Sequence, residues 1–230
     1  MVLSKFKESI IDLLFPPRCV GCGSGGSFLC PSCIRLLPRL YPPYCERCSI
    51  PIIRGTLCPT CLRSPPIIDG IRSLFWYQRA IRDAILWFKY KNLKALASPL
   101  AELMAEYLRS NPLPIDILVA VPLHPKRIRQ RGYNQSYLLA RELSRLSGLV
   151  LMEGSLIRLR DTTSQTILGA QERRSNVRGA FECKDQRLAG KRIGLIDDVC
   201  TTGSTLDACA AVLKERGGSS VWGLTLAREN

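Results

Sequence analysis

The sequence predicts an α/β fold, in which helices flank a Rossmann-like parallel β-sheet and a small cysteine-rich module precedes it. Two observations indicate the sheet: short apolar runs alternate with amphipathic helical patterns, and two of the runs end in polar loops. A third indicates the module, because four Cys-x-x-Cys pairs fall between residues 19 and 61. A chain of 230 residues, 46% hydrophobic, can form one ordinary domain and this appendage. We place the boundary after Pro66, which gives regions 1–66 and 67–230.

The stretch 192–218 reads as a strand, an acidic pair, a hydroxyl-rich loop and a helix. The apolar run 193–196 is short enough for a buried strand, and Asp197 and Asp198 follow it. The loop after them contains Thr201, Thr202, Gly203, Ser204 and Thr205. Helical spacing then relates Leu206, Cys209, Ala210 and Leu213, and Gly217 stands where a helix commonly ends.

This order of elements suits a ribose 5-phosphate. A loop that leads into a helix points free backbone N–H groups at one place, where the helix dipole adds positive charge. The loop hydroxyls add donors, and Gly203 lets the backbone approach an oxyanion. Asp197 and Asp198 would repel a phosphate but can accept hydrogen bonds from a neighbouring diol. The alternative is a strand-to-helix turn that is polar only because turns are polar.

The same stretch resembles the PRPP-binding motif of type I phosphoribosyltransferases. The resemblance implies a fold of that type, with Asp197 and Asp198 as the catalytic acidic pair that holds the ribose 2′- and 3′-hydroxyls. It also implies that the loop 201–205 binds the 5-phosphate and that Mg²⁺ accompanies PRPP. Ser204 stands where that family often has glycine, and Cys200 lies within the loop. Neither departure removes a phosphate donor.

A second polar loop follows the apolar run 115–121, which reads as a central parallel strand. Ligands of open α/β sheets bind beyond the carboxyl ends of strands, so we expect this loop to face the same site as 201–205. In type I phosphoribosyltransferases the matching loop binds pyrophosphate, which implies that role for Leu123, His124, Lys126 and Arg127. His124 is the only histidine, and a structural role beside a proline competes with a role as general base.

The other elements of region 67–230 follow from periodicity. Strands are predicted at 71–77, 156–159 and 221–226, and helices at 79–89, 94–110 and 133–147, the last ending at Gly148. Their buried faces are predicted to contain Leu96, Leu100, Leu103, Met104, Tyr107, Leu139, Leu143 and Leu146. The segment 160–181 is polar and basic. It is either a solvated loop or, with its neighbour Arg158, a segment that closes over a polyanion through Arg160, Arg173, Arg174 and Arg178.

The cysteine-rich region predicts structural zinc. The pairs are Cys19 and Cys22, Cys30 and Cys33, Cys45 and Cys48, and Cys58 and Cys61. A Cys-x-x-Cys pair places two sulfurs on one tight turn, and two such turns complete a tetrahedral site. We expect two Zn²⁺ ions, since a cytoplasmic setting disfavours disulfides and the repetition disfavours redox dithiols. Pairing in sequential order needs no chain crossing, and interleaved pairing remains open.

The composition limits location and partners. No run approaches the roughly 18 apolar residues of a membrane span, and the start of the chain lacks a signal-peptide cleavage site. Residues 1–15 instead predict a short amphipathic helix with Phe6, Ile10, Leu13 and Leu14 on one side, and we expect a cytoplasmic protein without membrane contact. The formal net charge is +14, and it falls to about +10 with eight thiolates and two Zn²⁺ ions. That excess suits a polyanion or nucleic acid, although a generic basic surface would carry it too.

Several segments together resemble ComF-type proteins, over nearly the whole chain. They are the cysteine-rich region, 121–135, 165–181 and 195–205, in that order, with Lys89-Tyr90 at the end of a predicted helix. The most specific are RGYNQ, from Arg131 to Gln135, and IDDVCTTGST, at 196–205. ComF-like proteins are associated with the use of incoming DNA, in natural transformation or in growth on DNA. The resemblance implies such a role for this chain.

Two functions of different classes fit these residues. The first is a Mg²⁺-dependent phosphoribosyltransferase, in which the acidic pair holds the ribose and Lys126 and Arg127 stabilise the departing pyrophosphate. The second is a non-catalytic module that senses PRPP or a nucleotide and binds single-stranded DNA or a DNA-uptake helicase. Aromatic residues either stack on bases or belong to the core; they include Tyr41, Tyr44, Trp76, Tyr77 and Trp87. No motif identifies an acceptor base.

Overall fold

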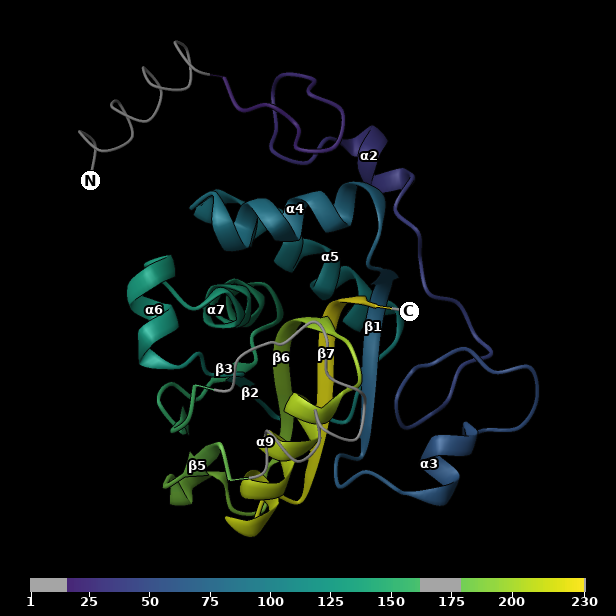
Figure 1. The fold of residues 1–230 in the computed structure, drawn as a ribbon, viewed down its shortest axis with the longest axis vertical. Helices are drawn as coiled ribbons and strands as arrows, with labels where there is room; N and C mark the ends of the chain where they lie inside the picture. Colours follow the sequence, from purple (N-terminus) through teal and green to yellow (C-terminus); the bar gives the residue numbers. More distant parts are fainter. Residues whose placement is uncertain (1–15, 162–178, 230) are drawn as a thin grey trace.

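The structure is a computed structural model that describes residues 16–161 and 179–229 (Figure 1). Two sequence-based expectations fall outside these residues. One is the amphipathic helix at 1–15, and the other is the ligand contact expected of Arg173, Arg174 and Arg178. In the described part of the chain, no helix combines the length and the apolar character that crossing a bilayer requires.

A five-stranded parallel sheet with the order β1-β7-β6-β2-β3 forms the centre of the fold (Figure 1). Its strands are β1 (Gly70–Trp76), β2 (Ile117–Ala120), β3 (Val150–Leu151), β6 (Arg192–Cys200) and β7 (Ser220–Arg228). A separate antiparallel pair joins β4 (Leu156–Arg158) to β5 (Phe181–Cys183). The strands β6 and β7 lie in the middle of the large sheet, where helices cover both faces and apolar side chains dominate.

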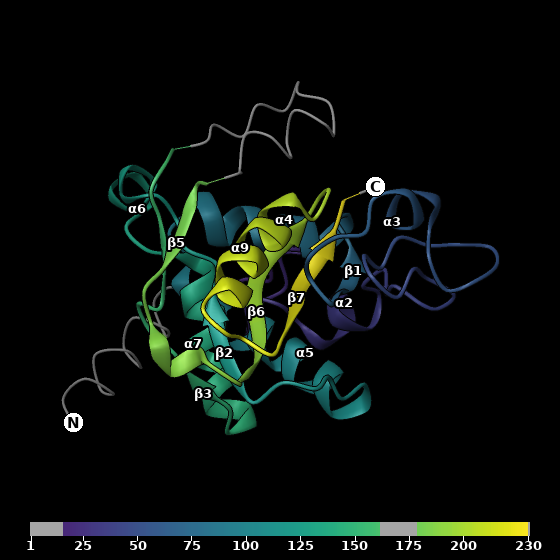
Figure 2. The ribbon, with the colours of Figure 1, turned by 90° about the horizontal axis from the view of Figure 1, so that it is seen from below.

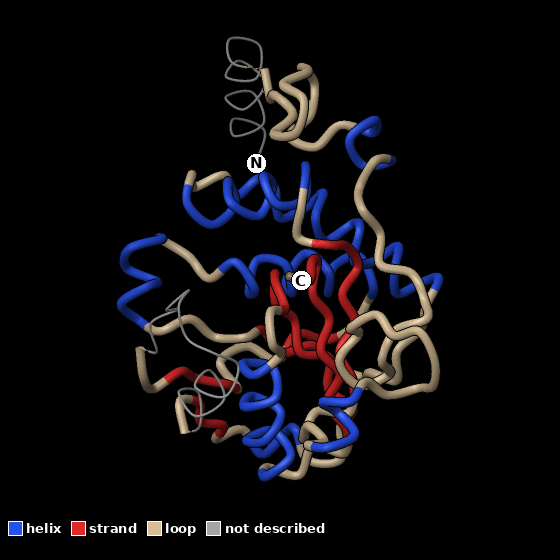
Figure 3. The backbone as a smooth tube through the Cα atoms, turned by 45° about the vertical axis from the view of Figure 1, so that its right-hand side comes forward, coloured by secondary structure: helices blue, strands red, loops and turns tan. Residues whose placement is uncertain are grey.

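Helices pack on both faces of this sheet and create two cores. One face carries α4 (Arg79–Tyr90), the short 3-10 helix η1 (Lys94–Leu96), α5 (Ala97–Ser110) and α7 (Gln135–Ser147). The opposite face carries α9 (Ser204–Glu215), which Figure 2 shows beside β6 and β7. A second 3-10 helix, η2 (Gln186–Leu188), contributes Leu188 to that second core. Figure 3 shows the strands enclosed between these helical layers.

The predicted fold class is confirmed, and most elements lie within two residues of their expected bounds. The faces predicted to be buried on α5 and α7 are buried, with Tyr107 and Leu146 partly so. Gly148 and Gly217 follow the ends of α7 and α9 in the left-handed conformation, with φ values of 75° and 87°. Glycine adopts this conformation without steric cost, which explains why both helices end there.

Two elements differ from the sequence-based expectation. The strand expected at 193–196 extends to Cys200, because Asp197 and Val199 continue to pair with β7. The acidic pair therefore belongs to the strand and not to the loop after it. The helix α6 (Pro125–Arg131) was not expected, since it has seven residues and buries none of them. Proline at its first position and the capping residue His124 start this helix, not an apolar face.

The first cysteine module, residues 16–37, packs on α4. It includes the short helix α2 (Pro31–Arg35), and its Leu29 and Leu37 are buried in the same core as α4 and α5. A Cβ added to Gly21 would lie 2.7 Å from Ala80 Cβ, so the module and α4 are in direct contact. The chain then runs along the free edge of β1, where Leu40 N donates to Leu74 O at 2.9 Å.

The second cysteine module, residues 43–64, lies against the other end of β1 (Figure 1). It includes α3 (Pro59–Arg63). Ile71 N donates to Arg47 O at 2.9 Å, and the hydroxyl of Ser49 donates to Ile71 O. Both modules thus contact the sheet domain. The boundary between regions 1–66 and 67–230 stays a prediction.

Candidate functional site

The acidic pair lies near the carboxyl end of β6, in the middle of the sheet. Asp197 and Asp198 are 9% and 2% exposed, although carboxylates are rarely buried without partners. The two side chains find their partners on different helices of the same layer, Asp197 on α7 and Asp198 on α4.

Asp197 accepts hydrogen bonds from α7 and from its own strand. Ser136 Oγ donates to Asp197 Oδ1 at 2.7 Å, and Asp198 N donates to the same oxygen at 2.9 Å. Burial, together with the charge of Asp198, raises the pKa of Asp197 from 3.8 to about 6, because both disfavour its ionised form. Ser136 is fully buried and directly follows the RGYNQ motif, so that motif places a donor on the acidic pair.

Asp198 forms an ion pair with the last full turn of α4. Lys89 Nζ lies 2.9 Å from Asp198 Oδ1, and the two side chains are 18% and 3% exposed. Burial lowers the pKa of Lys89, but attraction to Asp198 outweighs this effect and raises the pKa above its ordinary value. The other oxygen, Asp198 Oδ2, is buried and has no hydrogen-bond partner among the described residues. An unpaired buried acceptor of this kind is costly unless a ligand supplies the donor.

The loop after β6 has the form of an anion cradle. Gly203 precedes α9 with a φ of +80°, a conformation that favours glycine, and an added Cβ would also lie 2.9 Å from Ile71 Cδ1. The hydroxyls of Thr202 and Ser204 are 2.8 Å apart and hydrogen-bonded to each other. Ser204 is the first residue of α9, and Thr205 follows it. Backbone N–H groups and hydroxyls thus gather at the positive end of the α9 dipole.

The second loop lies at the start of α6, and its residues have structural partners in this state. Leu123 is buried, and His124 caps α6 by accepting from Lys126 N through Nδ1 at 3.3 Å. Arg127 Nε lies 3.3 Å from Asp161 Oδ1, and Lys126 Nζ lies 3.9 Å from Asp161 Oδ2. The basic side chains predicted to bind pyrophosphate thus already lie near a carboxylate, which a phosphate would have to displace.

The RGYNQ motif connects α6, α7 and α4. Gly132 ends α6 in the left-handed conformation, and the hydroxyl of Tyr133 donates to Phe88 O in α4. Asn134 caps α7 by accepting from Ser136 N at 3.0 Å, and its amide donates to Val121 O at 3.0 Å. These contacts fix the helices that carry Lys89 and Ser136. The motif therefore acts on the acidic pair through position, without itself touching it.

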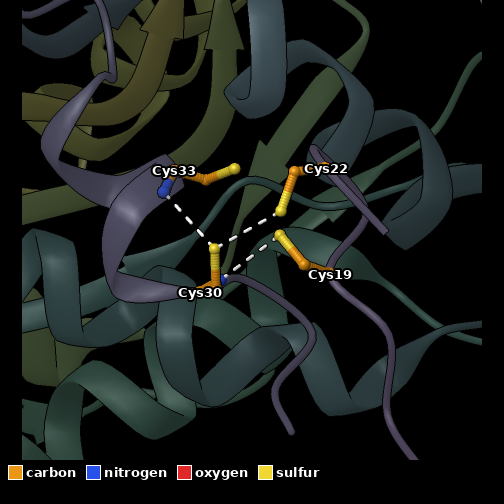
Figure 4. Close-up of side chains that lie close together, drawn as sticks. All are labelled: Cys19, Cys22, Cys30 and Cys33. Carbon is orange, nitrogen blue, oxygen red and sulfur yellow. Dashed lines mark hydrogen bonds between the residues drawn. The ribbon is translucent and has the colours of Figure 1, made fainter. Parts of the chain in front are cut away.

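The eight cysteines of the Cys-x-x-Cys pairs form two clusters in sequential order (Figure 4 shows the first). Within each cluster the four sulfur atoms lie within 4.8 Å of one another, and no pair forms a disulfide. Cys22 Sγ lies 3.6 Å from Cys30 Sγ, and Cys48 Sγ lies 3.7 Å from Cys58 Sγ. Tetrahedral Zn–S bonds of about 2.3 Å imply sulfur separations of about 3.8 Å. The residues therefore fit two structural Zn²⁺ ions, and sequential pairing is the arrangement observed.

The residues also fit Mg²⁺ that arrives with a ligand. Mg²⁺ prefers oxygen ligands and is held in many proteins by one or two carboxylates together with substrate phosphates. Asp198 Oδ2 is a carboxylate oxygen of this kind that has no other partner among the described residues. Lys89 already neutralises part of the charge, so the phosphates of the ligand would supply most of the coordination.

Two residues of this site were missed by the sequence-based site prediction. Lys89 was noted only as part of a resemblance, and Ser136 was not singled out. The signal for Lys89 was a cationic residue at the end of an otherwise apolar helix face. Ser136 follows a specific motif but has no pattern of its own. The predicted roles of Asp197, Asp198 and the loop residues stay predictions about ligand contact.

The fold and the site together define an α/β protein with two four-cysteine modules. Residues 10–62 match the family described as "Double zinc ribbon domain". The chain is 30% identical over 224 residues to Competence protein F of Haemophilus influenzae, covering 91% of this chain and 97% of that protein. It is 32% identical over 200 residues to the DNA utilization protein YhgH of Escherichia coli K12, covering 84% and 87%. The chain therefore belongs to the ComF family, which includes these proteins and Competence protein ComFC of Bacillus subtilis.

Solved structures with partial similarity to this chain include two enzymes. Glutamine PRPP amidotransferase of B. subtilis superimposes with a TM-score of 0.39 at 21% identity, covering 56% of this chain and 26% of that chain. A purine phosphoribosyltransferase of Pyrococcus horikoshii superimposes with a TM-score of 0.36 at 18% identity, covering 56% and 70%.

Proposed function

We propose that the chain binds PRPP, or a related ribose 5-phosphate, together with Mg²⁺, and that it acts in the cytoplasm in the use of incoming DNA. The observation that carries the proposal is the convergence of sequence-distant polar groups on one acidic pair. Lys89 from α4 and Ser136 from α7 meet Asp197 and Asp198 of β6, directly before the hydroxyl-rich loop. A core that served packing alone would gain nothing from burying three charges there.

Each part of the site has a distinct task in this proposal. Asp198 Oδ2 accepts from one hydroxyl of the ribose, and Asp197 accepts from the other when ionised. The loop 201–205 donates to the 5-phosphate. Leu123, His124, Lys126 and Arg127 surround the pyrophosphate, whose charge competes with Asp161 for the two basic side chains. Mg²⁺ would neutralise the phosphates when bound.

This arrangement can support transfer of the phosphoribosyl group. Displacement at ribose C1 develops positive charge on the sugar and negative charge on the departing pyrophosphate. The buried carboxylates would stabilise the positive charge on the sugar, and the basic loop would stabilise the negative charge on the pyrophosphate. The alternative function, a sensor that binds PRPP without turnover, uses the same contacts and needs no acceptor. No described residue pattern identifies an acceptor base, so the two functions are distinguished by experiment.

The DNA-related part of the proposal comes from the relatives. Their names connect them with competence and with DNA utilization. The net charge of +14 fits contact with single-stranded DNA, alone or with a DNA-uptake helicase. Binding through phosphates should weaken steeply as salt rises, and affinity measured from 50 to 200 mM salt tests this. A flat salt dependence would exclude a phosphate-dominated interface.

The test of the ligand is a calorimetric titration of PRPP with Mg²⁺. The wild type is compared with the double variant Asp197→Asn, Asp198→Asn, which keeps the shape of the site and removes both charges. We expect binding to the wild type and at least tenfold weaker binding to the variant, since hydrogen bonds to charged acceptors contribute about 1.5–3 kcal/mol each. Equal heats with both proteins would contradict the assignment.

Turnover is tested separately with the wild type. The protein is incubated with PRPP, Mg²⁺ and pools of nucleobases, and pyrophosphate release is measured. Release with one pool identifies an enzyme and its acceptor class. Binding of PRPP without release in any pool favours the sensor.

A further inference from the structure

The first cysteine module and the end of α4 enclose an apolar groove of about 640 Å³. Figure 1 shows this module, with α2, beside α4. Val20 and Phe28 of the module and Leu93 after α4 line the groove, and all three pack against the main core but stay partly exposed. Trp87 of α4 also lines it and is 45% exposed. The described residues therefore leave an apolar surface in contact with water at this place.

The groove lies where the described part of the chain begins. Pro16 and Pro17 line it, and residues 1–15 come directly before them. Leu14 is two positions from Pro16, so their Cα atoms lie within about 7 Å of each other in any conformation of the chain. A short tether of this kind gives the segment an effective concentration in the millimolar range at the groove. Residues 1–15 are therefore its nearest available partner.

The sequence of residues 1–15 fits an apolar groove. Its helical pattern places apolar side chains on one side, namely those of Phe6, Ile10, Leu13 and Leu14. A helix of this length is marginal in water and depends on the packing of its apolar face. The match to the double zinc ribbon family also begins at residue 10, so the end of the segment belongs to the same sequence unit as the cysteines.

We propose that residues 1–15 dock in this groove as an amphipathic helix, with their apolar side against Trp87 and Phe28. The groove is thus an interaction surface for a segment of the same chain, and the proposal does not depend on PRPP binding. It has a consequence for α4, because Trp87 and Lys89 belong to the last turn of that helix. Docking would restrain the turn that carries the ion-pair partner of Asp198.

Tryptophan fluorescence of the zinc-loaded full chain tests the contact. The chain has three tryptophans, and subtracting the emission of the same protein with Trp87→Phe isolates that of Trp87. The double variant Ile10→Ser, Leu13→Ser should raise acrylamide quenching of Trp87 at least about twofold, because it removes apolar side chains from the docked face. The matched control is Glu8→Ser, Asp12→Ser, on the opposite side of the helical pattern, which should be quenched as the wild type is. Unchanged quenching in Ile10→Ser, Leu13→Ser would overturn the proposal.

Hydrogen exchange shows where the variant acts. Ile10→Ser, Leu13→Ser should speed the exchange of amides in the last turn of α4 at least about tenfold and leave β6 and β7 as in the wild type. A zinc content equal to that of the wild type shows that both modules remain loaded. Faster exchange in β6 and β7 as well would indicate a general loss of stability and would contradict a local docking site.

Two other partners for the apolar side of residues 1–15 would give different results. Exchange with a second copy of the chain would make the quenching of Trp87 depend on protein concentration, whereas docking of a tethered segment does not depend on it. A lipid surface would bind the wild type, but not Ile10→Ser, Leu13→Ser, in vesicles of phosphatidylcholine and phosphatidylserine. Either of these results would overturn the proposal. Quenching that is independent of protein concentration, together with equal vesicle binding by the two proteins, supports docking in the groove.

Discussion

Lys89 and Asp198 carry charges that the fold has removed from water. Their side chains are 18% and 3% exposed, with 2.9 Å between Nζ and Oδ1. Removing two charges from water costs several kcal/mol, and their attraction repays this only while both are present. A change at one partner therefore leaves the other as an uncompensated buried charge.

We predict that Lys89→Met, which keeps the length of the side chain, lowers the free energy of unfolding by about 3 kcal/mol. Urea unfolding at pH 7.5, followed by tryptophan fluorescence, measures this. Adding Asp198→Asn to Lys89→Met removes the orphaned charge and should recover part of the loss. The control is Lys184→Met, because Lys184 is 73% exposed beside Glu182 and its pair contributes at most about 1 kcal/mol. An equal loss in the two lysine variants would contradict the buried-pair account.

The raised pKa of Asp197 has a consequence for stability. Its pKa is about 6 in the folded protein and 3.8 in an exposed reference, so the folded state binds the proton more tightly. Stability falls as pH rises through the interval between these two values, because the unfolded state then loses its proton first. Below that interval both states are protonated, and Asp197 has no effect.

We predict that Asp197→Asn stabilises the free protein at pH 7.5, by up to about 3 kcal/mol, while accepting the same hydrogen bond from Ser136. The difference from wild type should shrink as pH approaches 4. Zinc loss at low pH affects both proteins, so the difference between them at each pH is the quantity to measure. A difference that is constant from pH 4.5 to 7.5 would show that Asp197 does not titrate in this interval.

At the scale of elements, the junction of β6 and α9 depends on Gly203. Its φ of +80° already disfavours any other residue, and a Cβ would also meet Ile71 Cδ1 at 2.9 Å. We predict that Gly203→Ala weakens ribose 5-phosphate binding at least tenfold and lowers stability by about 1–2 kcal/mol. Calorimetry and thermal unfolding measure the two effects.

Gly190 provides the matched control for this prediction. It has a similar φ of +73°, but a Cβ there meets nothing within 4 Å. Gly190→Ala should therefore show the loss of stability from backbone strain and keep normal ligand affinity. If Gly190→Ala also loses the ligand, the effect of Gly203→Ala is global and the loop assignment loses its support.

Sequence patterns predicted two kinds of element. These are the helices and strands that bury an apolar face, and the modules in which cysteines recur at a regular spacing. Leu100 on α5 and Leu143 on α7 each belong to an apolar pattern with helical spacing, and both are completely buried in the structure. The cysteine clusters were also predictable, because two nearby Cys-x-x-Cys pairs supply the four sulfur ligands of one tetrahedral metal site. The helix α6 has neither signal. Its start is determined by one proline and one capping histidine, which an apolar pattern does not detect.

Contacts between elements were the part that sequence patterns could not provide. Ser136 and Asp197 are 61 positions apart, and Lys89 is 109 positions before Asp198. Their meeting depends on strand order and helix register, which periodicity leaves open. The same holds for Arg228. Its sequence position is that of an ordinary strand end, and its burial and its contact with Cys48 of the second module depend on how distant segments pack.

At the scale of the whole molecule, the two cysteine modules contact different parts of the sheet domain. The first packs on α4 through Leu29 and through the contact of Gly21 with Ala80. The second contacts β1, and through Arg228 it contacts the strand that precedes the phosphate loop. Loss of one metal should therefore have different consequences from loss of the other. Among the described residues, the second module contacts Arg228, which also contacts Cys200 beside the candidate ligand loop.

We predict that Cys58→Ser and Cys30→Ser each reduce the zinc content from about two ions per chain to about one. Because Arg228 connects Cys48 O to Cys200 Sγ, Cys58→Ser should also weaken phosphate ligands at the α9 loop at least tenfold. Cys30→Ser should lower thermal stability through α4 and leave ligand affinity within threefold of wild type. Metal analysis, thermal unfolding and calorimetry with ribose 5-phosphate on the same preparations provide the comparison. If the two variants lose ligand affinity equally, the zinc modules act through overall stability, and the direct connection through Arg228 is wrong.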